Sequence, residues 1–160
     1  MKRIFSVLVE NRSGVLSKVS GLFARRSFNI DSLAVGETND PEVSCMTIVS
    51  SGSEQILEQV EKQLNKKLDV IKLKSFESHQ AVSRELIIIK LRYSKANREE
   101  LLSLCTLAGA KVVDADKKTM MIEMCDTPEK VQMLLYLLSG VSIIEVARTG
   151  VLALPKCSEN

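Results

Sequence analysis

The fold is decided by the stretch RIFSVLVENRSGVLSKVSGLFAR, residues 3–25. Its first part, up to Glu10, is rich in β-branched and aromatic residues and predicts a strand. Apolar residues then recur every three or four positions from Val15 to Phe23, which predicts an amphipathic helix over residues 14–26. The chain therefore opens with a strand, a short polar turn and a helix.

The same patterns extend outward through residue 76. Two strands follow the helix, over residues 28–38 and 42–50, and the Asn-Asp-Pro turn signal between them predicts a hairpin. Ser53 is the predicted N-cap of a second helix. An alternating segment, residues 69–76, completes the order β-α-β-β-α-β.

The pattern repeats after a polar stretch, residues 77–83, which predicts a linker. In the second half, Asn97 is the predicted N-cap of one helix, with Glu100 at the capping-box position. Thr127, followed by Pro128, predicts the start of the other helix. The last strands are expected within residues 142–154. The chain is thus assigned to the α+β class, with two tandem ferredoxin-like βαββαβ units, 1–76 and 84–160, each an antiparallel sheet with helices on one face.

The first strand carries apolar residues on both faces, with Phe5, Val7 and Val9 on one and Ile4 and Leu8 on the other. The sheet face without helices should therefore be covered rather than left in water. Homodimerisation is the simplest way to cover it, and we expect a homodimer.

Composition excludes several classes of protein. The formal net charge is only +2, from 22 basic and 20 acidic residues, so nothing favours a nucleic-acid or anionic-membrane partner. No apolar run approaches the roughly 20 residues of a membrane span, and no signal peptide is recognisable. The four cysteines form no CxxC pair and have no histidine nearby in sequence, which favours free thiols and argues against a metal site. We expect a cytoplasmic protein.

Catalytic constellations are missing from the sequence. The single histidine, His79, lies in the predicted linker, and no Ser-His-Asp or Cys-His set can be built around it. No glycine-rich phosphate loop and no HExxH motif occurs. We therefore predict that the chain has no catalytic residues of its own.

The turn ENRSGVL, residues 10–16, has two interpretations. Asn11 and Ser13 are helix-capping residue types and Gly14 permits a tight turn, so the segment could serve only to start the helix. Alternatively, the free N–H groups at the helix start could bind a carboxylate, and a glycine without a Cβ would let the ligand approach closely. Asn11 offers a donor and an acceptor that suit a zwitterion.

Residues 3–49 closely resemble the N-terminal ACT domain of the small, regulatory subunit of acetolactate synthase. The Asn-x-Ser-Gly-x-Leu turn is shared by ACT domains in general, whereas FNIDSLAVGET, residues 28–38, is specific to this subunit. VSRELIIIKL, KVVDA and IIEVARTGVLAL resemble the second domain of the same family. The resemblance covers almost the whole chain.

The resemblance implies a non-catalytic subunit that binds the catalytic large subunit, raises its activity and confers feedback inhibition by valine, with leucine and isoleucine as alternative effectors. Thiamine diphosphate, Mg and FAD are implied for the catalytic partner and no cofactor for this chain. ACT domains of the family pair side by side into an eight-stranded sheet, and the effector lies at the dimer interface. The effector-binding positions implied for this chain are Asn11, Ser13, Gly14, Val15 and Leu16 from one protomer, with Asn29 and Ile30 from the second.

Three departures from the family pattern stand out. Ser27 replaces a common glycine after the first helix, so this helix is expected to end differently. Cys45 replaces a common arginine, and residues 123–126 lack the usual Thr-Gly. The last two bear on partner contacts more than on ligand binding.

Two other functions fit the sequence less well. A transcription regulator that senses amino acids would need a DNA-binding element, and no segment is left to supply one. A stand-alone enzyme on this fold would need an acid–base set, which is missing. The sequence therefore favours the regulatory subunit.

Overall fold

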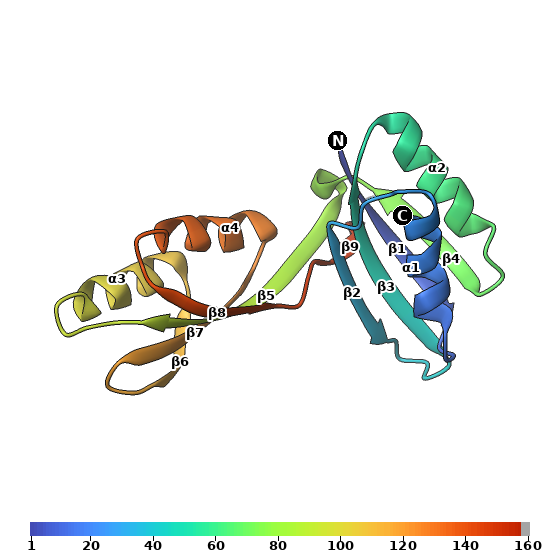
Figure 1. Ribbon diagram of the computed structural model, residues 1–160. Helices are drawn as coiled ribbons and strands as arrows, with labels where there is room; N and C mark the ends of the chain where they lie inside the picture. The colour runs from blue at the N-terminus through green and yellow to red at the C-terminus, as the bar shows by residue number, and fades with distance from the viewer. Residues whose placement is uncertain (158–160) are drawn as a thin grey trace. The chain divides into compact units, whose positions relative to one another are not determined.

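The structure is a computed structural model in which residues 1–157 are described, and it forms two compact units (Figure 1). The first unit contains residues 1–83 together with the tail from residue 151, and the second contains residues 84–150. Both are βαββαβ units with antiparallel sheets, so the predicted α+β fold class is confirmed. Within residues 1–157, no helix has the length and apolar character that crossing a bilayer requires.

The sheet of the first unit has the strand order β2-β3-β1-β4, which leaves β2 and β4 at its edges. Every neighbouring pair is antiparallel. The elements are β1 (Lys2–Glu10), α1 (Val15–Arg25), β2 (Ser32–Glu37), β3 (Val43–Ser51), α2 (Glu54–Asn65) and β4 (Val70–Phe76).

Alternate residues of the central strands build the core of this unit. Phe5 pairs with Ile48 and Val7 with Met46 in the β1–β3 register, and all four side chains are buried. They pack against the apolar faces of the two helices. The helix residues in this cluster are Val15, Val19, Leu22, Phe23, Leu57, Val60 and Leu64.

The opposite sheet face is covered in part by the chain itself. Ile4, Val49 and Phe76 form a second buried cluster with Ala81 and Ala153. Ala153 lies in β9 (Leu152–Pro155), which pairs with the start of β5 (Ala81–Arg92). The expected covering of this face therefore comes, at this end of the sheet, from the tail of the same chain.

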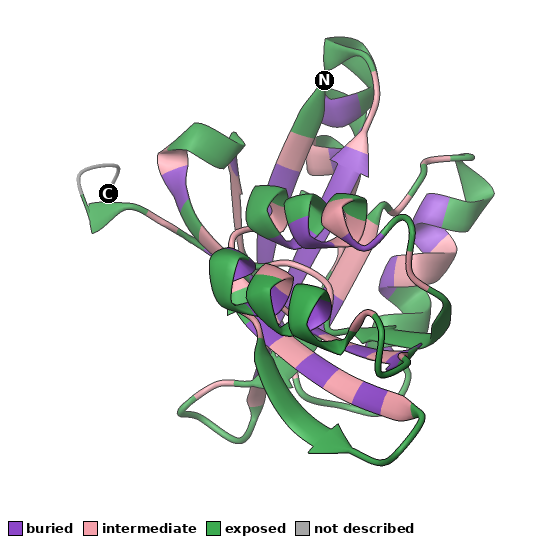
Figure 2. Ribbon diagram, turned by 90° about the vertical axis from the view of Figure 1, so that its left-hand side faces the viewer, coloured by how far each residue is buried: buried purple, intermediate pink, exposed green. Residues whose placement is uncertain are grey.

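The sheet of the second unit has the order β6-β7-β5-β8 and is also antiparallel. Buried and partly buried residues alternate along β5 and β7, as Figure 2 shows by colour. Glu85 at the start of this sheet is buried and accepts two hydrogen bonds from Arg148, at 2.7 and 2.8 Å. The remaining elements are α3 (Arg98–Ala108), β6 (Lys111–Ala115), β7 (Thr119–Asp126), α4 (Pro128–Leu137) and β8 (Ile143–Arg148).

All three predicted N-cap positions, Ser53, Asn97 and Thr127, are confirmed, but only two of the three side chains make a cap bond. The Ser53 side chain accepts a hydrogen bond from the N–H of Ile56, and that of Thr127 accepts one from the N–H of Lys130. The predicted capping box at Asn97 is wrong, because its side chain makes no cap bond. The Asn97 carboxamide oxygen instead accepts hydrogen bonds from the N–H and hydroxyl of Ser94, which closes the preceding turn.

Helix α1 ends on a left-handed residue even though that residue is not glycine. Ser27 has φ 54°. Its N–H donates to the Ala24 carbonyl and the Phe28 N–H to the Phe23 carbonyl, and the two phenyl rings meet edge-to-face with centroids 6.3 Å apart. This is a Schellman ending with its usual apolar contact. The expectation that Ser27 would change the helix ending is therefore wrong.

The predicted linker and second-unit boundary also differ from the structure. Ser78–Gln80 form a 3₁₀ turn, η1, in which the Gln80 side chain accepts from the Glu77 N–H, and residues 81–83 already belong to β5. The end of the chain was assigned to the second unit, residues 84–160. Residues 151–157 instead pack with the first unit, because Ala153 is buried there, while residues 158–160 lie outside the described part of the chain.

Candidate functional site

The turn between β1 and α1 is built around Gly14. Gly14 occupies the N-cap position with φ 86°, a backbone conformation that L side chains rarely adopt. Neither Asn11 nor Ser13, nor any other side chain in the described part of the molecule, caps this helix, so the interpretation of these two as capping residues is not supported. A Cβ placed on Gly14 would meet nothing within 4 Å. The space beside the Gly14 Cα is therefore open, and no side chain of residues 1–157 caps the start of α1.

The first N–H groups of an α-helix have no partner one turn earlier and carry partial positive charge. At this turn the Val15 N–H donates to the Arg12 carbonyl at 3.3 Å. No acidic residue lies in the first turn of α1. The helix start is therefore suited to an external carboxylate, for which no side-chain carboxylate of this turn competes.

Asn11 is held in one orientation. Its backbone N–H donates to the Glu42 carbonyl at 2.7 Å. Its side-chain Nδ2 donates to Glu37 Oε1 at 3.1 Å and to the Pro41 carbonyl at 2.8 Å. Because an amide nitrogen has two hydrogens, both are engaged, and the carboxamide oxygen remains as the acceptor for an incoming donor.

The surroundings of Asn11 are acidic. A hollow of about 320 Å³ next to it is lined by Glu10, Asp40 and Glu42, with the Arg12 guanidinium 3.2 Å from Glu10. Carboxylates in this number favour a positively charged group. The turn thus presents anion-binding N–H groups at the helix start and an environment for a cation around Asn11.

The predicted residues Asn29 and Ile30 lie at the other end of α1. They follow its last turn, whereas the Gly14 turn precedes its first, and an 11-residue helix is about 16 Å long. The strand register agrees, because the Asp31 N–H binds the Val49 carbonyl while Glu10 pairs with Val43. One protomer therefore does not bring the two halves of the predicted site together.

Individual predicted residues differ in what they can offer. Val15 is buried in the core, so only its backbone can reach a ligand, while Leu16 is 44% exposed. Ile30 packs partly against the core cluster. Asn29 donates from its side chain to Asp31 and accepts at its carbonyl from Ser50 Oγ at 2.6 Å. Ser13 is exposed.

Two partners of Asn11 were missed from the sequence, Glu37 and Pro41. Pro41 was recognised only as part of a turn signal, and Glu37 only as the end of a strand. The β2–β3 register pairs Glu37 with Ser44, close to where β1 ends beside Val43. Only this hairpin geometry brings them to Asn11.

Groups with perturbed pKa values lie elsewhere. Burial raises the pKa of the Cys105 thiol, and the hydrogen bond from Arg148 to Glu85 raises the pKa of that guanidinium. Within residues 1–157, no cluster of three or more metal-ligating side chains occurs. His79 is largely exposed, 3.4 Å from Glu77.

Comparisons with known proteins match both units. A family model for the AHAS small subunit-like ACT domain matches residues 5–72, and one for the small subunit of acetolactate synthase matches residues 84–157. An acetolactate synthase small subunit of Mycolicibacterium smegmatis is 46% identical over 94% of this chain and 89% of its own. One from Haemophilus influenzae is 38% identical over 100% of this chain and 99% of its own length.

A solved structure resembles the chain over its length. The crystal structure of the acetolactate synthase small subunit from Thermotoga maritima superposes with a TM-score of 0.89 at 34% identity, covering 98% of each chain.

Proposed function

Because the chain belongs to the family of acetolactate synthase small subunits, we propose that it is the regulatory subunit that activates the catalytic large subunit and confers feedback inhibition by valine. In this proposal the chain works in the cytoplasm as a homodimer and does no chemistry itself. Thiamine diphosphate, Mg and FAD belong to the large subunit. The role of this chain is to change the activity of the large subunit when an effector binds, and it contributes no catalytic group.

The observation that carries the proposal is the uncapped start of α1 beside an oriented asparagine. The valine carboxylate would accept hydrogen bonds from the N–H groups of residues 14–16, where the helix dipole favours negative charge, and would replace the long Val15–Arg12 bond. The ammonium group would donate to the Asn11 carboxamide oxygen, which the bonds to Glu37 and Pro41 hold in place. Glu37 thereby acts as a positioning residue.

A second copy would complete the site. β2 is an edge strand, and the Val35 side chain on it is 44% exposed. If two β2 edges pair antiparallel about a two-fold axis, the start of α1 in one protomer lies beside the end of α1 in the other. Asn29 and Ile30 of the second copy would then face the Gly14 turn, with Ile30 against the isopropyl group.

Inhibition follows from linkage. Valine shifts the complex only by as much as its affinity differs between two states. A ligand at the seam between two protomers holds them in one arrangement, and a catalytic subunit that contacts both protomers would respond to that arrangement. Leucine and isoleucine, which share the polar end of valine, would compete with lower affinity if the apolar contact is tight.

Calorimetric titration of the chain with valine, leucine and isoleucine tests the proposal. We expect saturable valine binding, and Gly14→Asp should weaken it at least about ten-fold because it places a negative charge where the carboxylate binds. Gly14→Asn is the matched control, since asparagine has the same shape and tolerates positive φ but adds no charge. Its loss of affinity should be clearly smaller. A Gly14→Asp chain with wild-type affinity would contradict the assigned site.

A further inference from the structure

A basic groove lies between the end of α1 and the middle of α2, apart from the Gly14 turn. It has a volume of about 580 Å³ and is lined by Arg25, Arg26, Phe28 and Gln59. The first three surround the left-handed Ser27, so the Schellman ending of α1 is what places them there. The edge-to-face contact with Phe23 holds the Phe28 ring.

Both guanidinium groups in this groove are unpaired within residues 1–157. No acidic side chain forms an ion pair with either, and α1 itself contains no acidic residue. A Cβ placed on Gly21 would lie 3.4 Å from Arg25 Nη1, so this guanidinium folds back over the helix. The Gln59 side chain likewise makes no hydrogen bond in this part of the chain.

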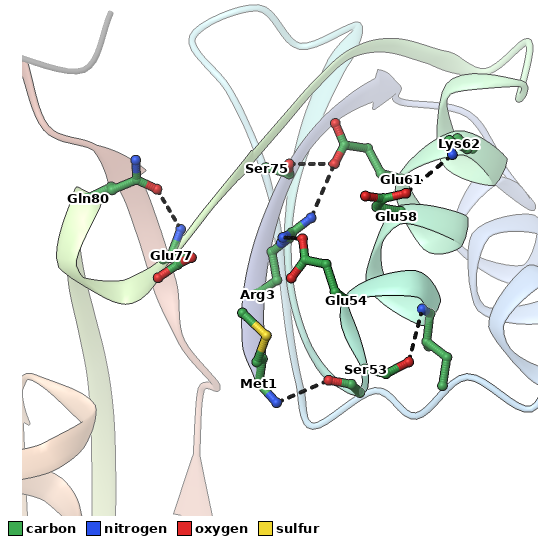
Figure 3. A network of polar contacts seen from close by, with 12 residues as sticks. Met1, Arg3, Ser53, Glu54, Glu58, Glu61, Lys62, Ser75, Glu77 and Gln80 are labelled. Carbon is green, nitrogen blue, oxygen red and sulfur yellow. Dashed lines mark hydrogen bonds and ion pairs between the residues drawn. The ribbon is translucent and has the colours of Figure 1, made fainter.

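The acidic residues of α2 are engaged elsewhere, as Figure 3 shows. Glu54 pairs with Arg3, and Glu58 lies 3.4 Å from Lys62 on its own helix. Glu61 accepts from Ser75 Oγ at 2.6 Å and lies 3.8 Å from Arg3. Three carboxylates on the neighbouring helix thus leave the groove without a counter-charge.

A simpler role accounts for part of this arrangement. Basic residues in a last helical turn interact favourably with the negative end of the helix dipole. An interaction with the helix dipole does not require a hollow that Phe28 and Gln59 also line. If it were the whole role, removing the two arginines would change only the stability of the chain. Guanidinium groups are, in contrast, well suited to binding carboxylates bidentately.

We propose that this groove is a docking site for an acidic segment of the catalytic large subunit, with a carboxylate bound between Arg25 and Arg26. This inference rests on the proposed function. Arg25, Arg26 and Gln59 are all exposed, so a free anion here would stay hydrated and weakly held. A carboxylate carried by a large partner would be shielded from water by the contacts around it, which strengthens the pairing.

The test compares the full-length wild type with the double variant Arg25→Gln, Arg26→Gln for binding to the purified large subunit at low and moderate salt. We expect the Kd of the variant to rise at least ten-fold at low salt and to depend less on salt. Circular dichroism and valine titration should be unchanged. The matched control is Lys95→Gln, Arg98→Gln, which removes two positive charges from exposed residues of the second unit, and its Kd should stay within two-fold of wild type.

Other outcomes would overturn the inference. A double variant that binds the large subunit as the wild type does would remove the docking site but leave the regulatory function standing. If the control variant Lys95→Gln, Arg98→Gln bound the large subunit as weakly as the double variant, the loss of affinity would come from the change in net charge and not from the groove. If the variant lost binding of inorganic phosphate while keeping its affinity for the large subunit, the groove would be a small-anion site. A wild-type chain that failed to bind the large subunit would overturn the proposed function as well.

Discussion

Among individual residues, Ser27 carries the most unfavourable backbone conformation. It is the one non-glycine residue with positive φ in residues 1–157. A left-handed conformation costs an L-residue about 1–2 kcal/mol, and glycine avoids it but loses about 0.5–1 kcal/mol through its freedom in the unfolded chain. We therefore expect Ser27→Gly to raise the stability of the first unit by about 0.5–1 kcal/mol, measured by thermal unfolding.

Ser27→Ala is the control for this prediction, because alanine keeps the Cβ and the strain. It should change stability little. A Gly variant no more stable than the Ala variant would show that the left-handed conformation carries no strain here. The sequence alone pointed to an altered helix ending, but the Phe23–Phe28 contact and two backbone hydrogen bonds outweigh the penalty of one serine.

The candidate site shows which residue properties can be read from sequence. The Gly14 turn was recognisable because its residue types and the helix pattern after it are local features. The orientation of Asn11 was not, because Glu37 and Pro41 are brought to it by pairing of β2, β3 and β1. The separation of Asn29 from Gly14 likewise follows from the length of α1, so a site drawn from both needs two chains.

Among secondary-structure elements, a predicted capping residue makes its side-chain cap bond where no nearby donor competes for the same side-chain oxygen. Thr127 caps α4, and the fixed φ of Pro128 prepares the first helical turn. Asn97 occupies the N-cap position of α3, but its side chain makes no cap bond, because Ser94, three residues earlier, offers two donors to the same oxygen. Asparagine side chains favour both helix caps and local turns, so a nearby donor can compete with the cap bond. Helices and strands themselves were predictable, since their apolar periodicity is what the core requires.

The β6–β7 turn should make the second unit sensitive to acid. Asp116 accepts hydrogen bonds from the N–H groups of Lys118 and Thr119 at 2.7 and 2.6 Å, and these bonds lower its carboxyl pKa. A lowered folded-state pKa means that the stabilisation is present above the unfolded-state pKa near 4 and is lost as pH falls through the folded value. Asp116→Asn should therefore destabilise the chain more at pH 7 than at pH 3.

Tyrosine fluorescence during thermal unfolding suits this measurement, because there is no tryptophan and both tyrosines, Tyr93 and Tyr136, lie in the second unit. An equal loss of stability at both pH values would show that the charge of Asp116 is not what holds the turn. A further carboxyl, Asp126, also has a lowered pKa through its bond to Lys130, so the Asp116→Asn variant should retain some acid sensitivity.

At the scale of the whole molecule, the two similar units could be predicted from the sequence, but the position of the tail, residues 151–157, could not. Two similar halves were visible from the repeated pattern. The return of residues 151–157 to the first unit was not, because it depends on contacts between segments far apart in sequence. The Val151 N–H donates to Ser32 Oγ and the Lys156 N–H to the Gln80 carbonyl, each at 2.8 Å.

This arrangement predicts different behaviour for two fragments. Residues 84–150 hold a complete core with the Glu85–Arg148 pair and should fold alone. Residues 1–83 lack Ala153 and leave Ile4, Val49 and Phe76 partly exposed to water. Losing these apolar contacts should cost about 1–2 kcal/mol, or roughly 5–10 °C in melting temperature for a unit of this size.

A synthetic peptide of residues 151–157 added in excess should restore much of that stability to fragment 1–83. The same peptide with Ala153→Asp should not, because a carboxylate at a buried position would lose its hydration without gaining a partner. Circular dichroism melting of the fragment with each peptide measures both effects. If the fragment melted at the same temperature with and without the native peptide, the tail would be a passive covering and the first unit would be complete at residue 83.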